Sequence, residues 1–145
     1  MTADTASRGW TLHPQLERDT HAAGDLPLSR VLLIDDANYP WLLLVPRRPA
    51  TVEIVDLPEA ERTQLMGEIS QASRVLKAIT GCDKINVAAL GNVVPQLHVH
   101  VIARTRSDPA WPKPVWGAVP PKDYSDAARQ QLLALLRQEL QLTRL

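Results

Sequence analysis

Phenylalanine is absent from this chain of 145 residues, cysteine occurs once and glycine only six times. A single cysteine, Cys82, excludes an internal disulfide and a Cys-x-x-Cys metal or redox motif, and it suits a reducing compartment. The 16 Lys and Arg residues balance the 16 Asp and Glu residues, so the chain lacks the net charge that favours nucleic acids or membrane surfaces. An anionic ligand must therefore be held by local groups.

Long apolar segments are also lacking. The longest runs, such as residues 41–45, are far shorter than the roughly 20 residues that cross a bilayer. The first ten residues contain no apolar core of a signal peptide, so we expect a cytoplasmic protein. We predict a single domain over 1–145, with 1–27 as an N-terminal extension and 107–145 as a Pro- and Trp-rich segment followed by a helix.

The pattern of apolar residues predicts an antiparallel sheet. Residues 31–34 and 42–45 indicate two buried strands, and the turn between them is rich in Asp and Asn. Two more strands are expected over 84–90 and 95–104. Residues 51–55 fit either a short edge strand or an extended link.

Three helices are expected around this sheet. A long helix begins at Asp56, where Asp-Leu-Pro-Glu forms a capping box, and it ends at Gly81. Its apolar positions recur with helical spacing at Leu65, Ile69, Ala72, Leu76 and Ile79. A short helix is expected from Pro14 to His21, and a terminal helix over about 125–142. The expected fold class is α+β, with an antiparallel sheet of about five strands, one long central helix and a C-terminal helix.

Residues 95–104 carry the strongest functional signal. Side chains alternate along a strand, so Gln96, His98 and His100 are expected on one face while the intervening apolar residues point to the core. A neutral imidazole is a competent nucleophile toward phosphorus. A second imidazole beside it can protonate a leaving oxygen or hold a phosphate oxygen. This pattern indicates an anion or phosphate site with a histidine nucleophile.

Neighbouring residues fit an anion site as well. Gly91 and Asn92 are expected in a tight turn that offers backbone N–H groups, and Arg104 and Arg106 can reach further phosphates. Two other interpretations of the histidines stay open. They can be a fragment of a zinc site, although no third ligand stands at an obvious spacing, or a structural, hydrogen-bonded pair.

The string Gln-Leu-His-Val-His-Val-Ile at 96–102 resembles the histidine triad (HIT) motif, in which three histidines alternate with apolar residues; Gln96 replaces the first histidine. The order of the expected elements from Leu28 to Arg104 also matches that family. The resemblance implies a compact α+β fold, usually dimeric, that binds nucleotides and cleaves or transfers a nucleoside monophosphate. Among members, the chain is most similar to bacterial hydrolases of dinucleoside polyphosphates.

The resemblance assigns roles by position. His98 is the nucleophile that takes the α-phosphoryl group, and His100 contacts phosphate and assists proton transfer. The other implied contacts to phosphate or ribose, with Asp36 preferred over Asp35, fall on Gln96, Asn86, Gly91, Asn92, Asp36 and Asp35. We expect an adenine-type nucleotide substrate, a homodimer, and no membrane or nucleic-acid partner. No metal ligand or required cofactor is expected, and Mg²⁺ enters with a polyphosphate substrate.

Two departures from the family pattern bear on the chemistry. Gln96 cannot gain a proton near neutral pH, and Trp41 stands where many members have another histidine. The resemblance therefore leaves protonation of the leaving group to His100 or to the substrate. Retention of His100 favours hydrolysis over transfer. The alternatives are a nucleotide-binding module with little turnover and a metal-binding protein that uses His98 and His100.

The Pro- and Trp-rich segment 111–116 allows two interpretations. It can be a rigid flap that contributes to nucleotide specificity, by stacking on a base or by supplying Lys113 to a phosphate. It can also simply pack across the sheet or a dimer interface. His13 and His21 are expected to be surface or structural residues, and Cys82 a small buried one.

Overall fold

The computed structural model describes residues 4–145; residues 1–3, with which the predicted N-terminal extension begins, lie outside the described residues. Five strands form one antiparallel sheet in the order β1-β2-β3-β5-β4. Their bounds are Thr20–Asp25 (β1), Ser29–Ile34 (β2), Trp41–Pro46 (β3), Lys84–Ala88 (β4) and Val99–Arg104 (β5). The predicted α+β architecture is confirmed.

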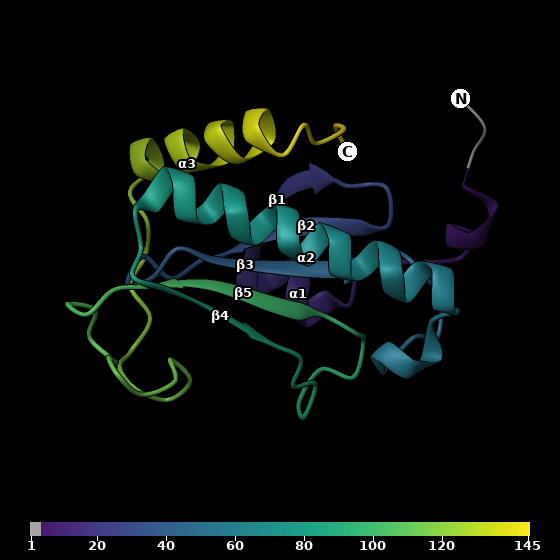
Figure 1. The fold of residues 1–145 in the computed structure, drawn as a ribbon, viewed down its shortest axis with the longest axis horizontal. Helices are drawn as coiled ribbons and strands as arrows, with labels where there is room; N and C mark the ends of the chain where they lie inside the picture. The colour runs from purple at the N-terminus through teal and green to yellow at the C-terminus, as the bar shows by residue number, and fades with distance from the viewer. Residues whose placement is uncertain (1–3) are drawn as a thin grey trace.

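The helices lie on both faces of this sheet. Helix α2 (Glu59–Thr80) crosses one face with α3 (Asp126–Glu139) beside it, and the short α1 (Pro14–Asp19) lies on the other face (Figure 1). Two 3₁₀ turns, Thr5–Ser7 and Ile54–Asp56, complete the regular structure. None of the helices within 4–145 has the length and apolar composition needed to cross a membrane.

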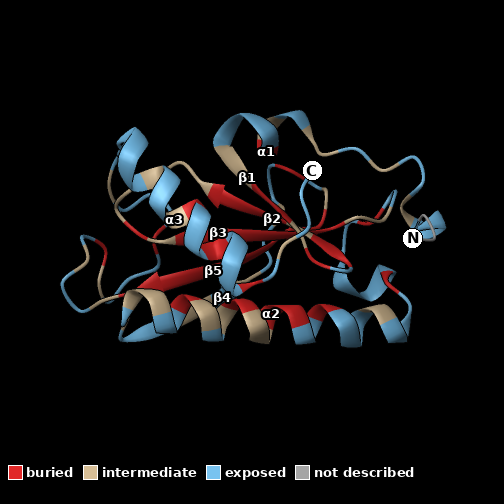
Figure 2. Ribbon diagram, turned by 90° about the horizontal axis from the view of Figure 1, so that it is seen from above, coloured by how far each residue is buried: buried red, intermediate tan, exposed pale blue. Residues whose placement is uncertain are grey.

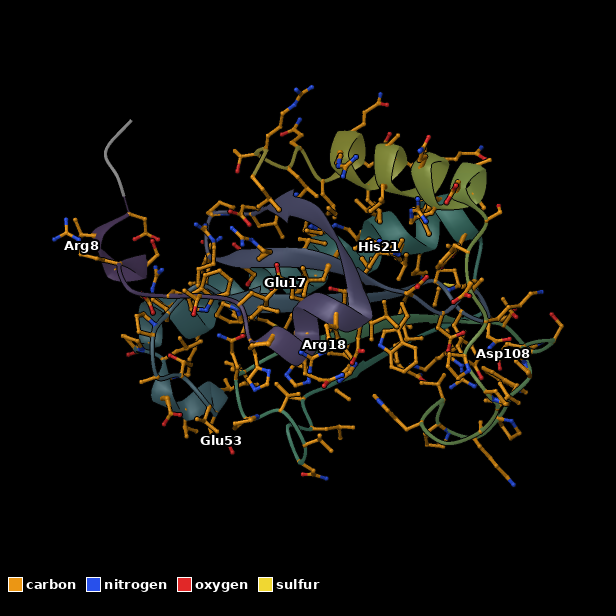
Figure 3. All side chains as sticks on the ribbon, turned by 180° about the vertical axis from the view of Figure 1, so that it is seen from behind. Arg8, Glu17, Arg18, His21, Glu53 and Asp108 are labelled. Atoms are coloured by element: carbon orange, nitrogen blue, oxygen red, sulfur yellow. The ribbon has the colours of Figure 1, made fainter. Side chains whose placement is uncertain are left out.

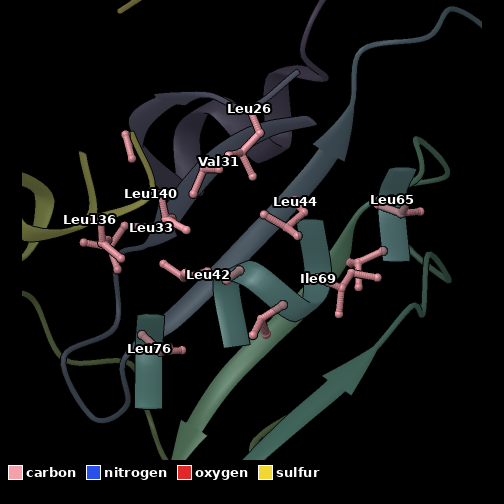
Figure 4. Packing of buried hydrophobic residues seen from close by; sticks show 14 of the residues in the cluster. Leu26, Val31, Leu33, Leu42, Leu44, Leu65, Ile69, Leu76, Leu136 and Leu140 are labelled. Carbon is pink, nitrogen blue, oxygen red and sulfur yellow. The ribbon is translucent and has the colours of Figure 1, made fainter. Parts of the chain in front are cut away.

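The main core lies between the sheet and helices α2 and α3. Figure 2 shows the buried stripe of α2 facing the strands, and Figure 4 shows the leucines that meet there. The expected α2 face is confirmed: Leu65, Ile69, Ala72 and Leu76 are buried in this core, with Ile79 at its margin. Burial of each such side chain contributes about 1.5–3 kcal/mol for the larger apolar residues.

A smaller core holds α1 against the opposite face of the sheet (Figure 3). Leu16 of α1 packs on Leu32 and Leu43, which point away from the main core, and on Val45 and Val94. Leu16 is the one buried residue of this six-residue helix. The rest of this face carries the histidines.

The predicted bounds of the first helix are wrong at its C-terminal end. The helix from Pro14 ends at Asp19 rather than at His21, and residues 20–25 form edge strand β1. The sequence Thr-His-Ala-Ala-Gly-Asp has no alternation of large apolar residues, and an irregular register around Gly24 interrupts the pairing with β2. Backbone pairing with β2 therefore outweighs the low strand propensity of residues 20–25. Residues 51–55 form no strand, so β1 is the fifth.

The helix ends follow the predicted chemistry only in part. Helix α2 begins at Glu59 because Asp56 is used elsewhere: its carboxylate accepts the N–H groups of Val52 and Glu53 and closes the preceding 3₁₀ turn. Gly81 ends α2 with a φ of 65°, as expected. The terminal helix is shorter than predicted and ends at Glu139.

The strand that carries the histidines begins later than predicted. Strand β4 ends at Ala88 and β5 begins at Val99, so residues 89–98 form a long loop instead of a tight turn. Pro95 lacks a backbone N–H, and Gly91 has a φ of 77°, so neither continues a strand easily. As a result, Gln96 lies outside the ladder.

Candidate functional site

His98, the last residue before β5, and His100, within β5, lie side by side on the face of the sheet that α1 partly covers. Their ring centroids are 5.1 Å apart, and the two residues are only 8% and 5% exposed. Both line a cavity of about 460 Å³, a volume typical of small-molecule sites. The other lining residues come from α1, β2, β3, the loop 89–98 and Trp116: Gln15, Leu16, Asp19, Ile34, Trp41, Leu43, Leu90, Gly91, Asn92, Val93, Val94 and Trp116.

A backbone carbonyl fixes the orientation of His98. Its Nδ1 lies 2.7 Å from the carbonyl oxygen of Gln96. A carbonyl oxygen can only accept, so Nδ1 carries a proton and donates it to this bond. In the neutral ring, Nε2 then bears the lone pair. His98 therefore presents a nucleophilic nitrogen.

An indole fixes His100 in the opposite way. Trp41 donates its Nε1–H to His100 Nδ1 at 2.9 Å, so the neutral ring carries its proton on Nε2. Burial, and then the charge of nearby His98, lower the pKa of His100 from 6.5 to about 4. At neutral pH His100 is a hydrogen-bond donor without charge. The two rings thus offer one lone pair and one N–H.

Trp116 closes the cavity over His100. Its ring centroid lies 5.0 Å from that of His100 and 5.8 Å from that of Trp41, with both pairs close to perpendicular. Trp111, at the other end of the Pro- and Trp-rich segment, instead packs over the guanidinium of Arg104. One tryptophan of the segment therefore faces the cavity and the other anchors the segment to the sheet.

Arg104 holds that segment and does not reach toward a ligand. It is 2% exposed, and its guanidinium donates to both carboxylate oxygens of Asp108 and to the carbonyl of Lys113. Burial raises the pKa of Asp108, but the bonds from Arg104 and three backbone N–H groups outweigh it and hold that pKa below its ordinary value. The prediction that Arg104 contacts a phosphate of the ligand is therefore wrong.

Two more predicted contacts lie away from the cavity lining. Asn86 on β4 uses its side-chain oxygen to accept from Arg104 at 2.8 Å. Arg106 is exposed beyond β5, and its backbone N–H donates to Asp83. Both residues contribute to the far end of β5 rather than to the histidine end.

Gln96 does not line the cavity that holds the histidines. Its side-chain oxygen accepts the backbone N–H of His13, and its side-chain N–H donates to the carbonyl of Thr11, both at 2.9 Å. Alternation still holds along this stretch, since Leu97 lies in the main core with Val99 and Val101, but the amide of Gln96 is engaged outside the cavity. The amide instead pairs with the N-terminal segment as a peptide group of a strand does.

The hydrogen bonds of Gln96 to residues 11 and 13 bring α1 to the site. The sequence pattern did not indicate this. His13 Nδ1 accepts the N–H of Gln15 and caps α1, and the helix then places Gln15, Leu16 and Asp19 in the cavity wall. A six-residue helix has too little amphipathic periodicity to reveal such a wall.

The loop before β5 forms another wall. Gly91 and Asn92 line the cavity. Gly91 has a φ of 77°, and a Cβ placed on it would lie 3.4 Å from the carbonyl oxygen of Val94. Any other L residue is strained there, so glycine sets the course of the loop beside the histidines.

Asp35 and Asp36 line a second hollow of about 430 Å³, which shares Asp19, Ile34 and Trp41 with the first. Asp36 is buried, and its Oδ1 accepts from the backbone and side chain of Asn38 and from the N–H of Lys122. Asp35 is more exposed, and its Oδ1 lies 3.4 Å from Nε2 of His21. The acidic turn therefore adjoins the histidine cavity without entering it.

Other reactive groups stand apart from this site. Within residues 4–145, no three His, Cys, Asp or Glu side chains are grouped closely enough to hold a metal ion. A metal bound by His98 and His100 would need further ligands from outside that range or from a substrate. Cys82 packs at the edge of the main core, behind the sheet.

Known proteins share the fold of this chain. The HIT domain model matches residues 15–107. The histidine triad protein of Bradyrhizobium japonicum is 60% identical, with a TM-score of 0.89 over 90% of this chain and 98% of that one. The histidine triad protein of Marinobacter aquaeolei VT8 is 45% identical, with a TM-score of 0.89 over 92% and 98%.

A third structure, the histidine triad protein of Sinorhizobium meliloti 1021, is 40% identical, with a TM-score of 0.88 over 90% of this chain and 97% of that one. A search of the curated proteins gave no match. The domain match spans both histidines, the α1 wall and the acidic turn. This chain belongs to the histidine triad (HIT) family.

Proposed function

We propose that this protein is a nucleotide hydrolase that cleaves at the α-phosphorus of a nucleoside phosphate conjugate through a covalent intermediate on His98. Membership of the HIT family supports a nucleotide-binding or hydrolase role. The observation that carries the proposal is the 2.7 Å bond from His98 Nδ1–H to the Gln96 carbonyl, which leaves Nε2 as the nucleophile. Both histidines are buried side chains that line a hollow of about 460 Å³.

The proposed reaction has two displacements. Nε2 of His98 forms a bond to the α-phosphorus, and the bond to the leaving group breaks with its electron pair going to the leaving atom. Water then attacks the phosphorus, the N–P bond returns its pair to Nε2, and the proton of water passes to solvent. His100 Nε2–H donates to a non-bridging phosphate oxygen in both steps.

The two adjoining hollows suggest how the substrate lies. The phosphate sits at the histidines beside the Gly91 loop, and the nucleoside extends past Trp41 toward Asp35 and Asp36. An adenine-type base is part of the proposal. The displacements call on no metal held by the chain, and Mg²⁺ enters bound to a polyphosphate substrate.

The test compares wild type with His98→Ala on diadenosine tetraphosphate and on an aminoacyl-adenylate mimic. We expect AMP release and an acid-labile AMP–protein adduct with wild type, and neither with His98→Ala. Cys82→Ala is the matched control, because that thiol lies behind the sheet and its loss should leave the adduct intact. Binding of AMP by wild type without product or adduct contradicts the enzyme proposal.

That last outcome describes the second candidate function, a nucleotide-binding module with little turnover. Gln96 favours it, because the residue at the first motif position is engaged with Thr11 and His13 and supplies no ionisable group to the cavity. Calorimetric titration of AMP into wild type and His98→Ala separates the two. Equal affinity without adduct formation identifies a binding module.

A homodimer and a cytoplasmic location belong to the same proposal. Within residues 4–145, no strand pairs with the outer edge of β4, where Val87 is 48% exposed. An open strand edge with an apolar side chain is suited to pairing with a second copy. We expect sedimentation to give a dimer, and Val87→Lys to shift it toward monomer.

A further inference from the structure

We infer that this site selects conjugates whose leaving group departs as an anion, above all phosphoric anhydrides, and discriminates against phosphoramidates, whose leaving group is an amine. The inference deepens the proposed function and rests on it, because attack by His98 alone admits both classes. It is carried by the hydrogen bond from Trp41 to His100. That bond decides what His100 can donate.

An imidazole acts as a strong acid only when both of its nitrogens carry protons. In this structure Nδ1 of His100 already accepts the indole N–H of Trp41, 2.9 Å away. A second proton on Nδ1 would set two N–H groups against each other, since an indole nitrogen cannot accept. His100 is therefore held as the neutral Nε2–H tautomer.

Aromatic packing holds the indole against His100. Trp41 is 7% exposed and lies between Tyr39 and Trp116, whose ring centroids are 6.2 and 5.8 Å from its own. Displacing it would open a void in a buried aromatic cluster. Burial of His100 and the nearby charge of His98 act in the same direction, because both lower the pKa of His100.

No other lining group takes over the role of an acid. Among residues 4–145 that line the cavity, the ionisable side chains are Asp19, His98 and His100. Asp19 is an exposed carboxylate that accepts from the side chain of Gln15, and His98 is committed as the nucleophile. The other elements against His100 supply Trp41 and Trp116, and the side chain of Gln96 turns to the N-terminal segment.

The two classes of substrate differ in what this arrangement must supply. When a P–O bond of an anhydride breaks, the electron pair stays on an oxygen of a phosphate, which departs as a stable anion. When a P–N bond breaks, the pair goes to nitrogen, and the amine can depart only if a proton reaches it. General-acid catalysis contributes about 10²–10⁴-fold. We therefore expect kcat/KM to favour the anhydride by roughly this factor.

The kinetic test uses two AMP conjugates, diadenosine tetraphosphate and adenosine 5′-phosphoromorpholidate, with the AMP–protein adduct measured in parallel. We expect adduct and turnover with the anhydride and at least roughly 100-fold lower kcat/KM with the morpholidate. Adduct formation with both conjugates at similar kcat/KM overturns the inference and leaves the proposed function standing. If no adduct forms with the anhydride or with the morpholidate, the proposed function is rejected, and the inference with it.

A spectroscopic test reads the tautomer directly. Long-range ¹H–¹⁵N correlation spectra distinguish an imidazole protonated on Nδ1 from one protonated on Nε2. We expect wild-type His100 as Nε2–H, and Trp41→Phe to release it to exchange between tautomers and to titrate at a higher pH. Trp116→Phe is the matched control, because Trp116 contacts the same ring without a hydrogen bond. An Nδ1–H tautomer in wild type contradicts the inference.

The same variant links structure to selectivity. In Trp41→Phe below neutral pH, His100 can carry two protons, so the preference for the anhydride should narrow by roughly tenfold, a part of what a general acid contributes. Trp116→Phe should keep the wild-type ratio even if both rates change. In one outcome, the spectra show that His100 exchanges between tautomers in Trp41→Phe while the ratio of kcat/KM for the two conjugates stays at its wild-type value. That result contradicts the assignment of selectivity to this bond.

Discussion

Two segments far apart in the chain flank the histidines, and they are held in different ways. The Pro- and Trp-rich segment is fixed by a buried ion pair between Arg104 and Asp108, with both side chains 5% exposed or less. The N-terminal segment is fixed through Gln96 by two neutral hydrogen bonds to backbone groups. Both segments place residues in the cavity wall, namely Trp116 on one side and α1 on the other.

The difference lies in what happens when each tie is broken. A buried charge that loses its partner is costly, so the segment that carries Trp116 is strongly anchored at Asp108. Two neutral bonds at a partly exposed site contribute about 0.5–1.5 kcal/mol each, and water can replace them. We therefore expect the hydrogen bonds of Gln96 to be lost more readily than the ion pair of Asp108, while the packing of Leu16 still holds α1 on the sheet.

The largest expected effect comes from breaking the ion pair. Asp108→Ala leaves the Arg104 guanidinium buried without its carboxylate and should lower the free energy of unfolding by about 3–5 kcal/mol, measured by urea denaturation. Arg106→Ala, on an exposed neighbour, should stay within about 0.5 kcal/mol. A loss below about 1 kcal/mol in Asp108→Ala would show that the pair does not hold this wall.

A comparable effect is expected from acid. The pKa of His100 is about 4 in the folded protein and near 6.5 in the unfolded chain, so the unfolded chain binds more protons between these values. The free energy of unfolding should therefore fall by about 3 kcal/mol as pH drops from 6.5 to 4, and this loss should stop below pH 4. In His100→Gln this part of the pH dependence should disappear. If the free energy of unfolding of His100→Gln depends on pH as in wild type, groups other than His100 cause the loss of stability.

A smaller effect is expected at the N-terminal tie. Gln96→Ala removes both bonds to residues 11 and 13 and should cost about 1–2 kcal/mol, with faster amide hydrogen exchange at His13. Nucleotide affinity should also weaken, because the segment that leads into α1 loses these two bonds. Gln131→Ala, on the exposed face of α3, is the control. If amide hydrogen exchange at His13 is unchanged in Gln96→Ala, the N-terminal segment is not held more weakly than the Pro- and Trp-rich segment.

The smallest expected effect on stability comes from Trp116. Its side chain is 38% exposed and meets His100 and Trp41 at an angle, so Trp116→Ala should lower the free energy of unfolding by about 0.5–1.5 kcal/mol. Loss of AMP affinity, measured by calorimetry, should exceed that of Trp111→Phe, which changes the anchor and not the cavity. A larger loss in Trp111→Phe would place the ligand elsewhere.

The parts of the fold that were predictable from the sequence are those with strong periodic signals. The α2 face repeats its apolar residues with helical spacing, and β2 and β3 are continuous apolar runs on either side of an Asp- and Asn-rich turn. Strand β1 was not predictable, because Thr-His-Ala-Ala-Gly-Asp has little strand propensity of its own. These residues form a strand because β2 provides an antiparallel partner for their backbone hydrogen bonds.

In the candidate site, the motif located the histidines but not their partners. The pairing of Trp41 with His100 joins residues 59 apart and depends on β3 lying next to β5, which no local pattern states. Alternation correctly placed Leu97 in the core, but it could not show that the amide of Gln96 is engaged by His13 and Thr11. The role of Arg104 was misread for a related reason, since Asp108 and Lys113 lie in a segment without periodicity.

The bond between Gln96 and His13 spans 83 positions in the chain. Closing so long a loop costs entropy that only later contacts return, so such contacts form late in folding. The hairpin of β2 and β3 and helix α2 are local and form without it. We therefore expect a chain that has formed this hairpin and helix to lack its α1 wall until the first residues dock.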